Sequence, residues 1–109
     1  MKVLFVNDDV QALCSEARIS VRKLGMPSAK KLHACMAGLF NARAVTDLFV
    51  GAPHPLKGNR LGDFAVSLHG GHRLVFQCSQ RPIPVHENGS TDWSSVTEII
   101  IIEVGDYHD

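Results

Sequence analysis

Six side chains of this sequence are of the types that move protons or bind phosphate groups. They are His54, Lys57, Arg73, Asp106, Tyr107 and His108. Histidine can act as an acid or a base because its unperturbed pKa of ~6.5 lies near working pH. Lysine and arginine can stabilise negative charge that develops on a reacting phosphate. Tyrosine can stack on an unpaired base or donate a proton.

Together these types suit cleavage of RNA by its own 2′-hydroxyl group. That reaction needs a base for the hydroxyl proton, an acid for the leaving 5′-oxygen, and cations around the phosphate, and it requires no metal ion or other cofactor. Lys57 and Arg73 are the candidate cations. The same side chains could bind phosphate without cleaving it, so the residue types alone leave both functions open.

Other common catalytic signatures are absent from the sequence, among them the P-loop, the dinucleotide-binding glycine motif, HExxH, the hydrolase nucleophile elbow and CxxC. His69 and His72 have the spacing of a zinc-ligand pair, but no third ligand accompanies them. We interpret them as polar residues that flank a turn.

The first half of the sequence predicts one strand and two helices that position these groups. Residues 2–5 form a short apolar run, residues 7–9 can cap a helix, and Gly25 ends its apolar pattern. A second helix is predicted over 27–43, close enough to form an antiparallel hairpin with the first. The expected buried stripes are Val10, Leu13, Cys14, Ala17, Val21 and Leu24, then Leu32, Cys35, Met36, Leu39 and Phe40.

The second half predicts strands. Residues 63–69 and 72–78 form a hairpin around the turn Gly70-Gly71, residues 80–95 form a long loop or a loose hairpin tip, and residues 96–104 form a last strand. Four consecutive isoleucines in that strand indicate burial on both faces. The order of one strand, two helices and three strands predicts an α+β fold with helices on one face of the sheet.

A two-residue turn fixes which hairpin residues face each other. The expected pairs are His69–His72, Leu68–Arg73 and Val66–Val75. Leu74 and Phe76 would then face the helices and Arg73 the opposite side. An arginine on that side suits an anionic ligand, although an ordinary surface arginine is equally consistent.

The totals predict one domain over residues 1–109 of a reduced cytosolic protein, with no membrane span or signal peptide. The three cysteines have no metal-site spacing. The net charge is zero, but residues 1–60 hold nine Lys/Arg against four Asp/Glu, and residues 61–109 hold two against seven. This +5/−5 division can form a basic surface, or the charges can interleave after folding.

Three ordered segments of the second half resemble motifs of the HigB-type killer proteins, a branch of the RelE/ParE toxin superfamily. Residues 54–67 (HPLKGNRLGDFAVS) resemble the "HPLKGdrxGxWaisv" segment of that branch. Residues 72–76 (HRLVF) resemble its "wRixF" strand, and residues 106–108 its terminal "DYH".

This resemblance implies a RelE-like microbial RNase fold, with helices against a twisted antiparallel sheet. It implies a toxin of a type II toxin–antitoxin system that cleaves mRNA in the A site of the 70S ribosome. The implied partner is a cognate helix-turn-helix antitoxin, through which alone the toxin would form larger assemblies.

The resemblance also implies roles for single residues. His54 and His108 would share the acid–base work, and which of them is the base stays open. Tyr107 would stack on a base or donate a proton, and Asp106 would orient its neighbours.

Lys57, Arg60 and Arg73 would bind the RNA, with Lys57 and Arg73 clamping the phosphate.

The sequence departs from the family by its neutral charge, by Phe64 in place of a tryptophan, and by the length of the 80–95 loop. Two alternatives follow. One is a ParE-like gyrase inhibitor, which would not need the catalytic set, and the other is a non-catalytic relative that only binds its partner.

Overall fold

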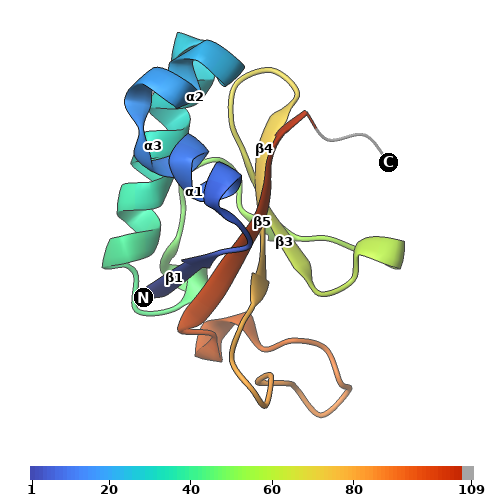
Figure 1. Cartoon of the computed structure of the whole chain (residues 1–109). Helices are drawn as coiled ribbons and strands as arrows, with labels where there is room; N and C mark the ends of the chain where they lie inside the picture. The colour runs from blue at the N-terminus through green and yellow to red at the C-terminus, as the bar shows by residue number, and fades with distance from the viewer. Residues whose placement is uncertain (107–109) are drawn as a thin grey trace.

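The computed structural model of the chain describes residues 1–106 as a five-stranded sheet with helices on one face (Figure 1). Its elements in chain order are β1 Lys2–Phe5, α1 Asp8–Ser15, α2 Ala17–Leu24, α3 Met26–Asn41, η1 Val45–Asp47, β2 His54–Pro55, η2 Gly58–Arg60, β3 Asp63–Ser67, β4 His72–Cys78, η3 Trp93–Ser95 and β5 Glu98–Asp106, where η marks a short 3₁₀ helix. The predicted α+β class is confirmed.

The strands lie in the order β1-β5-β4-β3-β2. β1 runs parallel to β5, and all the other neighbours are antiparallel. β5 therefore lies between two strands, as predicted. Burial on both faces is only partly confirmed, because Ile99 and Ile101 are fully buried but Ile100 and Ile102 are half-buried. The two-residue strand β2 was not expected, because its sequence contains a proline and turn residues rather than an alternating pattern.

The helical half differs from the prediction in the path of its first helix, and Ala17, expected in the buried stripe of that helix, is exposed. Asn7 caps α1 by accepting a hydrogen bond from the Val10 amide at 2.9 Å, as expected. The single helix predicted up to Gly25 is interrupted, because Glu16 has extended backbone angles (φ −113°, ψ 110°). The break redirects the chain, and Ser20 of α2 becomes fully buried, with its hydroxyl 3.1 Å from the His33 ring.

The core lies between α3 and the sheet. Leu32 and Leu39 of α3 are fully buried, together with Phe76 of β4 and Ile99 of β5. Phe40, expected in the same stripe, is 56% exposed. At 100° per residue it lies about 90° from the centre of the buried stripe, so it falls at the edge of the packed surface.

The β3–β4 hairpin is formed, but its register is shifted by one residue from the prediction. The observed pairs are Ser67–Arg73, Val66–Leu74, Ala65–Val75, Phe64–Phe76 and Asp63–Gln77. The Leu68 amide donates to the His72 carbonyl at 2.9 Å, so three residues, not two, make the turn. Leu74 and Phe76 still face the helices, and Arg73 points to the opposite side, as expected.

The β4–β5 ladder contains a β-bulge. Val75 pairs with Glu103 while the next residue, Phe76, pairs with Ile101. Ile102 is the extra residue, so side chains after it point to the face opposite to the one that regular alternation would give. Within residues 1–106, no helix is both long and apolar enough to cross a bilayer.

Candidate active site

The sheet face away from the helices carries most of the predicted site that the structure describes. We call it the open face, and its row of paired positions runs from Ala65 through Val75 to Glu103, next to Ser67 and Arg73. Ala65 and Val75 are fully buried, although neither belongs to the helix-side core. Other side chains on the open face must therefore shield these two residues from solvent, so this face also contains packed side chains.

His54 lies at the edge of the open face. It pairs with Ala65 across β2 and β3, so its side chain lies on the same side as that residue. Its Nδ1 is 2.9 Å from the carbonyl oxygen of Ala52. When Nδ1 donates to that carbonyl, Nε2 of the neutral ring carries the lone pair that can accept a proton. The ring is thus held in the tautomer that a general base needs.

The backbone before His54 is held in an unusual conformation. Gly51 (φ 72°) and Ala52 (φ 47°) are both left-handed. The Gly51 carbonyl accepts from the Ser67 amide at 2.7 Å, and a Cβ at Gly51 would lie 2.5 Å from a methyl carbon of Val66. This segment therefore packs closely against β3, and this contact fixes the position of the His54 backbone.

Arg73 shares the open face with His54. Its β4 position is two strands and two residues from that of His54. At about 4.8 Å per strand and 3.3 Å per residue, the two Cα atoms are about 12 Å apart. Both side chains can therefore approach one phosphodiester group that lies between them.

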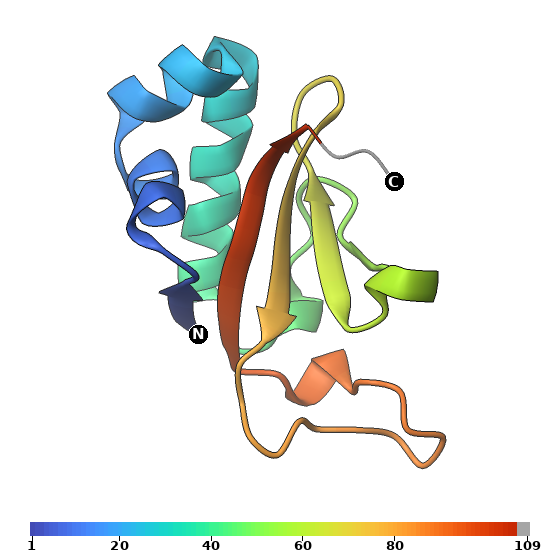
Figure 2. The same ribbon diagram turned by 45° about the vertical axis from the view of Figure 1, so that its right-hand side comes forward.

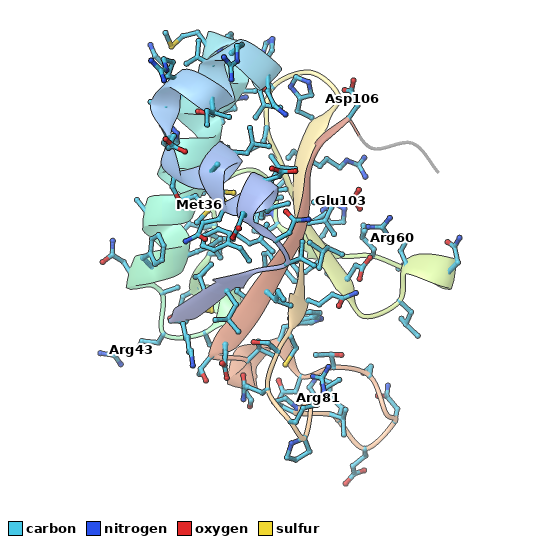
Figure 3. The ribbon with its side chains drawn as sticks, in the orientation of Figure 1. Met36, Arg43, Arg60, Arg81, Glu103 and Asp106 are labelled. Atoms are coloured by element: carbon cyan, nitrogen blue, oxygen red, sulfur yellow. The ribbon has the colours of Figure 1, made fainter. Side chains whose placement is uncertain are left out.

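Arg60 crosses the open face between two carboxylates (Figure 3). Its Nε donates to Asp63 at 2.6 Å, and its terminal nitrogen donates to Glu103. Asp63 belongs to β3 and Glu103 to β5, so the guanidinium spans β4 near Val75. The hydrogen bond to Glu103 raises the pKa of Arg60 further above its usual range. The predicted role of Arg60 in RNA binding stays a prediction, and the observed contacts indicate a structural role.

Asp106 lies on the other side of the sheet from Arg73. It pairs with His72, and its carboxylate is 3.5 Å from His72 Nε2. The other ring nitrogen is 2.7 Å from the hydroxyl of Ser28, a fully buried residue of α3. Asp106 therefore ties the end of β5 to β4 and α3 rather than reaching Arg73.

Tyr107 and His108 lie outside the described residues, so the expectation that they complete the site stays a prediction. The role predicted for Asp106, to orient those two neighbours, is likewise not tested.

Lys57 precedes η2 and lines a groove of about 680 Å³. The groove separates the segment 55–62 from the 80–95 loop, and both extend beyond the β3 edge of the sheet, far from α1 and α2 (Figure 2). His54 and Arg73 are not among its lining residues. Lys57 thus lies across a groove from the 80–95 loop, and nothing in the sequence indicated this proximity.

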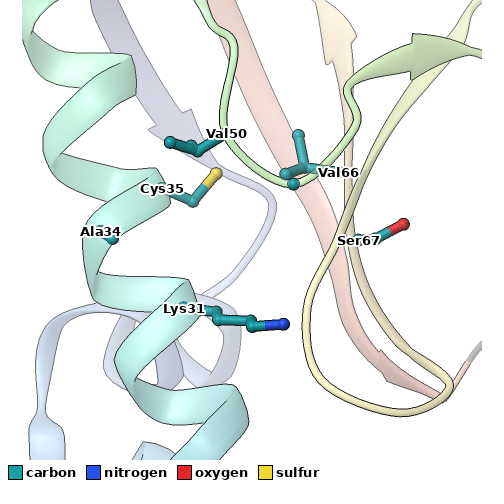
Figure 4. Close-up of a pocket in the computed structure, with 7 residues that line it drawn as sticks. Lys31, Ala34, Cys35, Val50, Val66 and Ser67 are labelled. Carbon is teal, nitrogen blue, oxygen red and sulfur yellow. The ribbon is translucent and has the colours of Figure 1, made fainter.

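A smaller hollow of about 300 Å³ lies between α3 and β3. Cys35 lines it from the helix and Val66 from the strand, with Lys31 at its margin (Figure 4). Burial raises the pKa of the Cys35 thiol to about 12. A thiol with so high a pKa is a weak nucleophile at neutral pH, so this hollow offers little chemistry.

Four residues that organise this region were missed in the sequence. They are Ser28, Asp63, His72 and Glu103. Each contacts a partner that the chain brings from another element, up to 44 residues away. Only Asp63 offered a local signal, three residues after Arg60. Among the described residues, no group of three His, Cys, Asp or Glu side chains is arranged to hold a metal ion.

Three solved structures of toxins resemble the chain over almost its whole length. A YoeB/ParE toxin from Agrobacterium tumefaciens gives a TM-score of 0.58 at 18% identity, covering 99% of this chain and all of the other. The YoeB–YefM complex from Staphylococcus aureus gives 0.53 at 20% identity, with 100% and 98% covered. The YoeB dimer from the same organism gives 0.53 at 18% identity, again with 100% and 98% covered.

No model of a protein family matches the sequence, and no curated protein matches it either. At these identities the structural likeness shows a shared fold. The fold implied by the sequence motifs is therefore confirmed.

Proposed function

We propose that this protein is the toxin of a type II toxin–antitoxin pair and an endoribonuclease that cuts mRNA on the ribosome without a metal ion. The observation that carries the proposal is the placement of His54 and Arg73 on the open face of a fold shared with YoeB toxins. Lys57, three residues after His54 along the chain, is the second cation of the proposed site. A helix layer covers the opposite face, so we place the scissile phosphate on the open one.

In the proposed reaction the 2′-oxygen of a nucleotide attacks the adjacent phosphorus and the bond to the 5′-oxygen breaks. His54 Nε2 takes the hydroxyl proton, or in the reverse assignment His54 protonates the leaving oxygen and His108 is the base. Arg73 and Lys57 stabilise the extra negative charge on the phosphorane, which is often the largest contribution to catalysis. Tyr107 stacks on the neighbouring base or donates a proton.

Within the superfamily, the three ordered motifs favour the HigB-type branch. The partner we expect is a small antitoxin with a helix-turn-helix fold. The complex of YoeB with YefM is a precedent for a toxin of this fold bound to a partner protein. The work site would be the cytoplasm, where ribosomes and mRNA are found.

Induction of this protein alone, followed by mapping of mRNA ends, tests the proposal. We expect growth to stop and mRNAs to carry new ends at in-frame codon positions. The variants Lys57→Ala and His54→Ala should lower cleavage by about 10²–10⁴-fold, the usual contribution of one charge-stabilising or acid–base group. Lys30→Ala, on the exposed surface of α3, is the matched control and should remain fully toxic.

Two outcomes would contradict the proposal. A change in DNA supercoiling without mRNA cuts would indicate a gyrase inhibitor, which the ParE designation of one structural neighbour keeps in view. Growth without any defect would indicate a protein that only binds its partner, a role compatible with the neutral charge.

A further inference from the structure

The groove beside Lys57 is the largest of the hollows described, at about 680 Å³ against about 300 Å³ for the cavity at Cys35. It lies between the segment that contains Lys57 and the long loop that distinguishes this chain from the family pattern. Its lining residues are Pro55, Leu56, Lys57, Leu61, Gly62, His86, Asn88, Gly89, Ser90, Thr91 and Trp93. A volume of this size falls in the usual range for small-molecule sites.

The loop wall of the groove is held by its own hydrogen bonds. The His86 amide donates to the Ser90 carbonyl at 2.8 Å, and Val85 bridges to Thr91. Asp92 accepts from the Ser95 hydroxyl at 2.9 Å and caps η3. These bonds form the wall before any ligand arrives, which lowers the entropic cost of binding.

Trp93 anchors that wall to the core. Its ring packs edge-on against Phe64 at a centroid distance of 4.9 Å and against Phe76 at 6.2 Å. Trp93 also lines the groove, so one side chain connects the buried aromatic cluster to the ligand space.

The lining has the chemistry of a site for a single-stranded nucleotide. It contains no carboxylate, and Lys57 supplies a positive charge that a phosphate can approach. Trp93, Pro55 and Leu61 offer apolar surface for a base. Amide and hydroxyl groups that can hydrogen-bond to a base edge come from Asn88, Ser90 and Thr91.

We infer that this groove binds one nucleotide of an RNA strand, across the edge strand β2 from the phosphodiester that the open face would cleave. The inference rests on the proposed function and adds a subsite to it. Lys57 is three residues from His54 along the chain, and Trp93 of the groove packs on Phe64, which faces the helices. A strand that passes His54 and bends around the β2 edge therefore reaches Lys57 and the groove. The 80–95 loop then forms one wall of a substrate-binding groove.

A binding titration tests this inference without any need for cleavage. The probe is a mixed-sequence RNA hexamer with 2′-O-methyl groups, which cannot be cut by its own 2′-hydroxyl. Trp93 is the chain's single tryptophan, so its fluorescence reports on the groove directly. We expect a saturable change in emission whose midpoint moves to higher RNA concentration as salt is raised.

Leu61→Asp places a carboxylate in the groove at a side chain that is 79% exposed, so the fold should tolerate it. It should weaken binding of the hexamer at least tenfold. Val85→Asp makes a matched change on the loop at a side chain that is 57% exposed and outside the groove lining, and it should bind like the parent protein.

Equal binding by the two variants would overturn the inference, as would a fluorescence change produced by inorganic phosphate alone. A parent protein that cuts mRNA but leaves Trp93 emission unchanged with the hexamer would also overturn it, while the proposed function would stand. Loss of both cleavage and binding would overturn the function itself.

Discussion

Replacing Arg60 with methionine should destabilise the fold by about 3 kcal/mol. The side chain of Asp63 is only 8% exposed, and it would lose its charged donor at 2.6 Å. A hydrogen bond to a buried charged group contributes about 1.5–3 kcal/mol. The pair with Glu103, whose side chain is 43% exposed, adds about 0.2–1 kcal/mol.

Urea denaturation followed by Trp93 fluorescence measures this loss, because the indole packs on the aromatic core. With a denaturant slope of about 1–3 kcal/mol per molar, the midpoint should fall by roughly 1–3 M at an unchanged slope. Arg22→Met, on the exposed surface of α2, removes the same side chain and should change the unfolding free energy by no more than about 0.5 kcal/mol.

The double variant Arg60→Met/Asp63→Asn tests whether Arg60 compensates the buried charge of Asp63. Neutralising Asp63 removes the buried charge that Arg60 compensates, so the double variant should be more stable than Arg60→Met alone. Gln77, whose amide donates to Asp63 at 2.8 Å, can keep its hydrogen bond to the new carboxamide oxygen. If Arg60→Met behaves like Arg22→Met, or if Asp63→Asn gives no recovery, Arg60 does not act as the counter-ion described.

Three further predictions concern the framework of the site. Gly51→Ala should lower the free energy of unfolding, measured thermally, by about 2 kcal/mol or more, because the new Cβ would collide with β3. Gly62 is also left-handed but faces open space, so Gly62→Ala should lower it clearly less. Equal losses of stability in the two variants would contradict this reasoning. Ser28→Ala should lower the unfolding free energy by about 1–3 kcal/mol in the same measurement, since it removes a buried hydroxyl that contacts the His72 ring and the His69 backbone. Burial raises the pKa of the Cys14 and Cys35 thiols to about 12. Between about pH 9 and 12 only the unfolded thiols ionise, so the unfolding free energy should fall as the pH rises through this range. A variant with both cysteines replaced by alanine that shows the same fall would refute this.

Much of the fold was predictable because it depends on short-range patterns. The cap at Asn7, the stop at Gly25 and the alternation in 72–78 are local signals, and each is confirmed. The break at Glu16 has no such signal, since neither glycine nor proline stands there and the cause is the packing of α2 on α3.

The hairpin register shows how far a local argument extends. Gly70-Gly71 suits a two-residue turn, but His69 joins the turn and moves every pair by one position. The side that each β4 residue faces was nevertheless correct, because it depends only on which positions of β4 are apolar.

The candidate site was predictable in its residue types and less so in its arrangement. The motif placed His54, Lys57 and Arg73 in order along the chain, and sheet pairing sets two of them on the open face. The carboxylate of Glu103 that holds Arg60 lies 43 residues away, so spacing could not reveal it. Contacts of that range follow from the assembled sheet alone.

The extra residue in β5 gives that strand an uneven tolerance to changes in chain length. Removing Ile102 would straighten the ladder and leave every other side chain of the strand on its present side, so a one-codon deletion there should still fold. Removing Ile100 instead would give the stretch before the bulge the wrong parity and pull core contacts out of place. The site of the deletion thus decides whether the shortened strand keeps Glu103 paired with Val75 and keeps Val104 packed against the core.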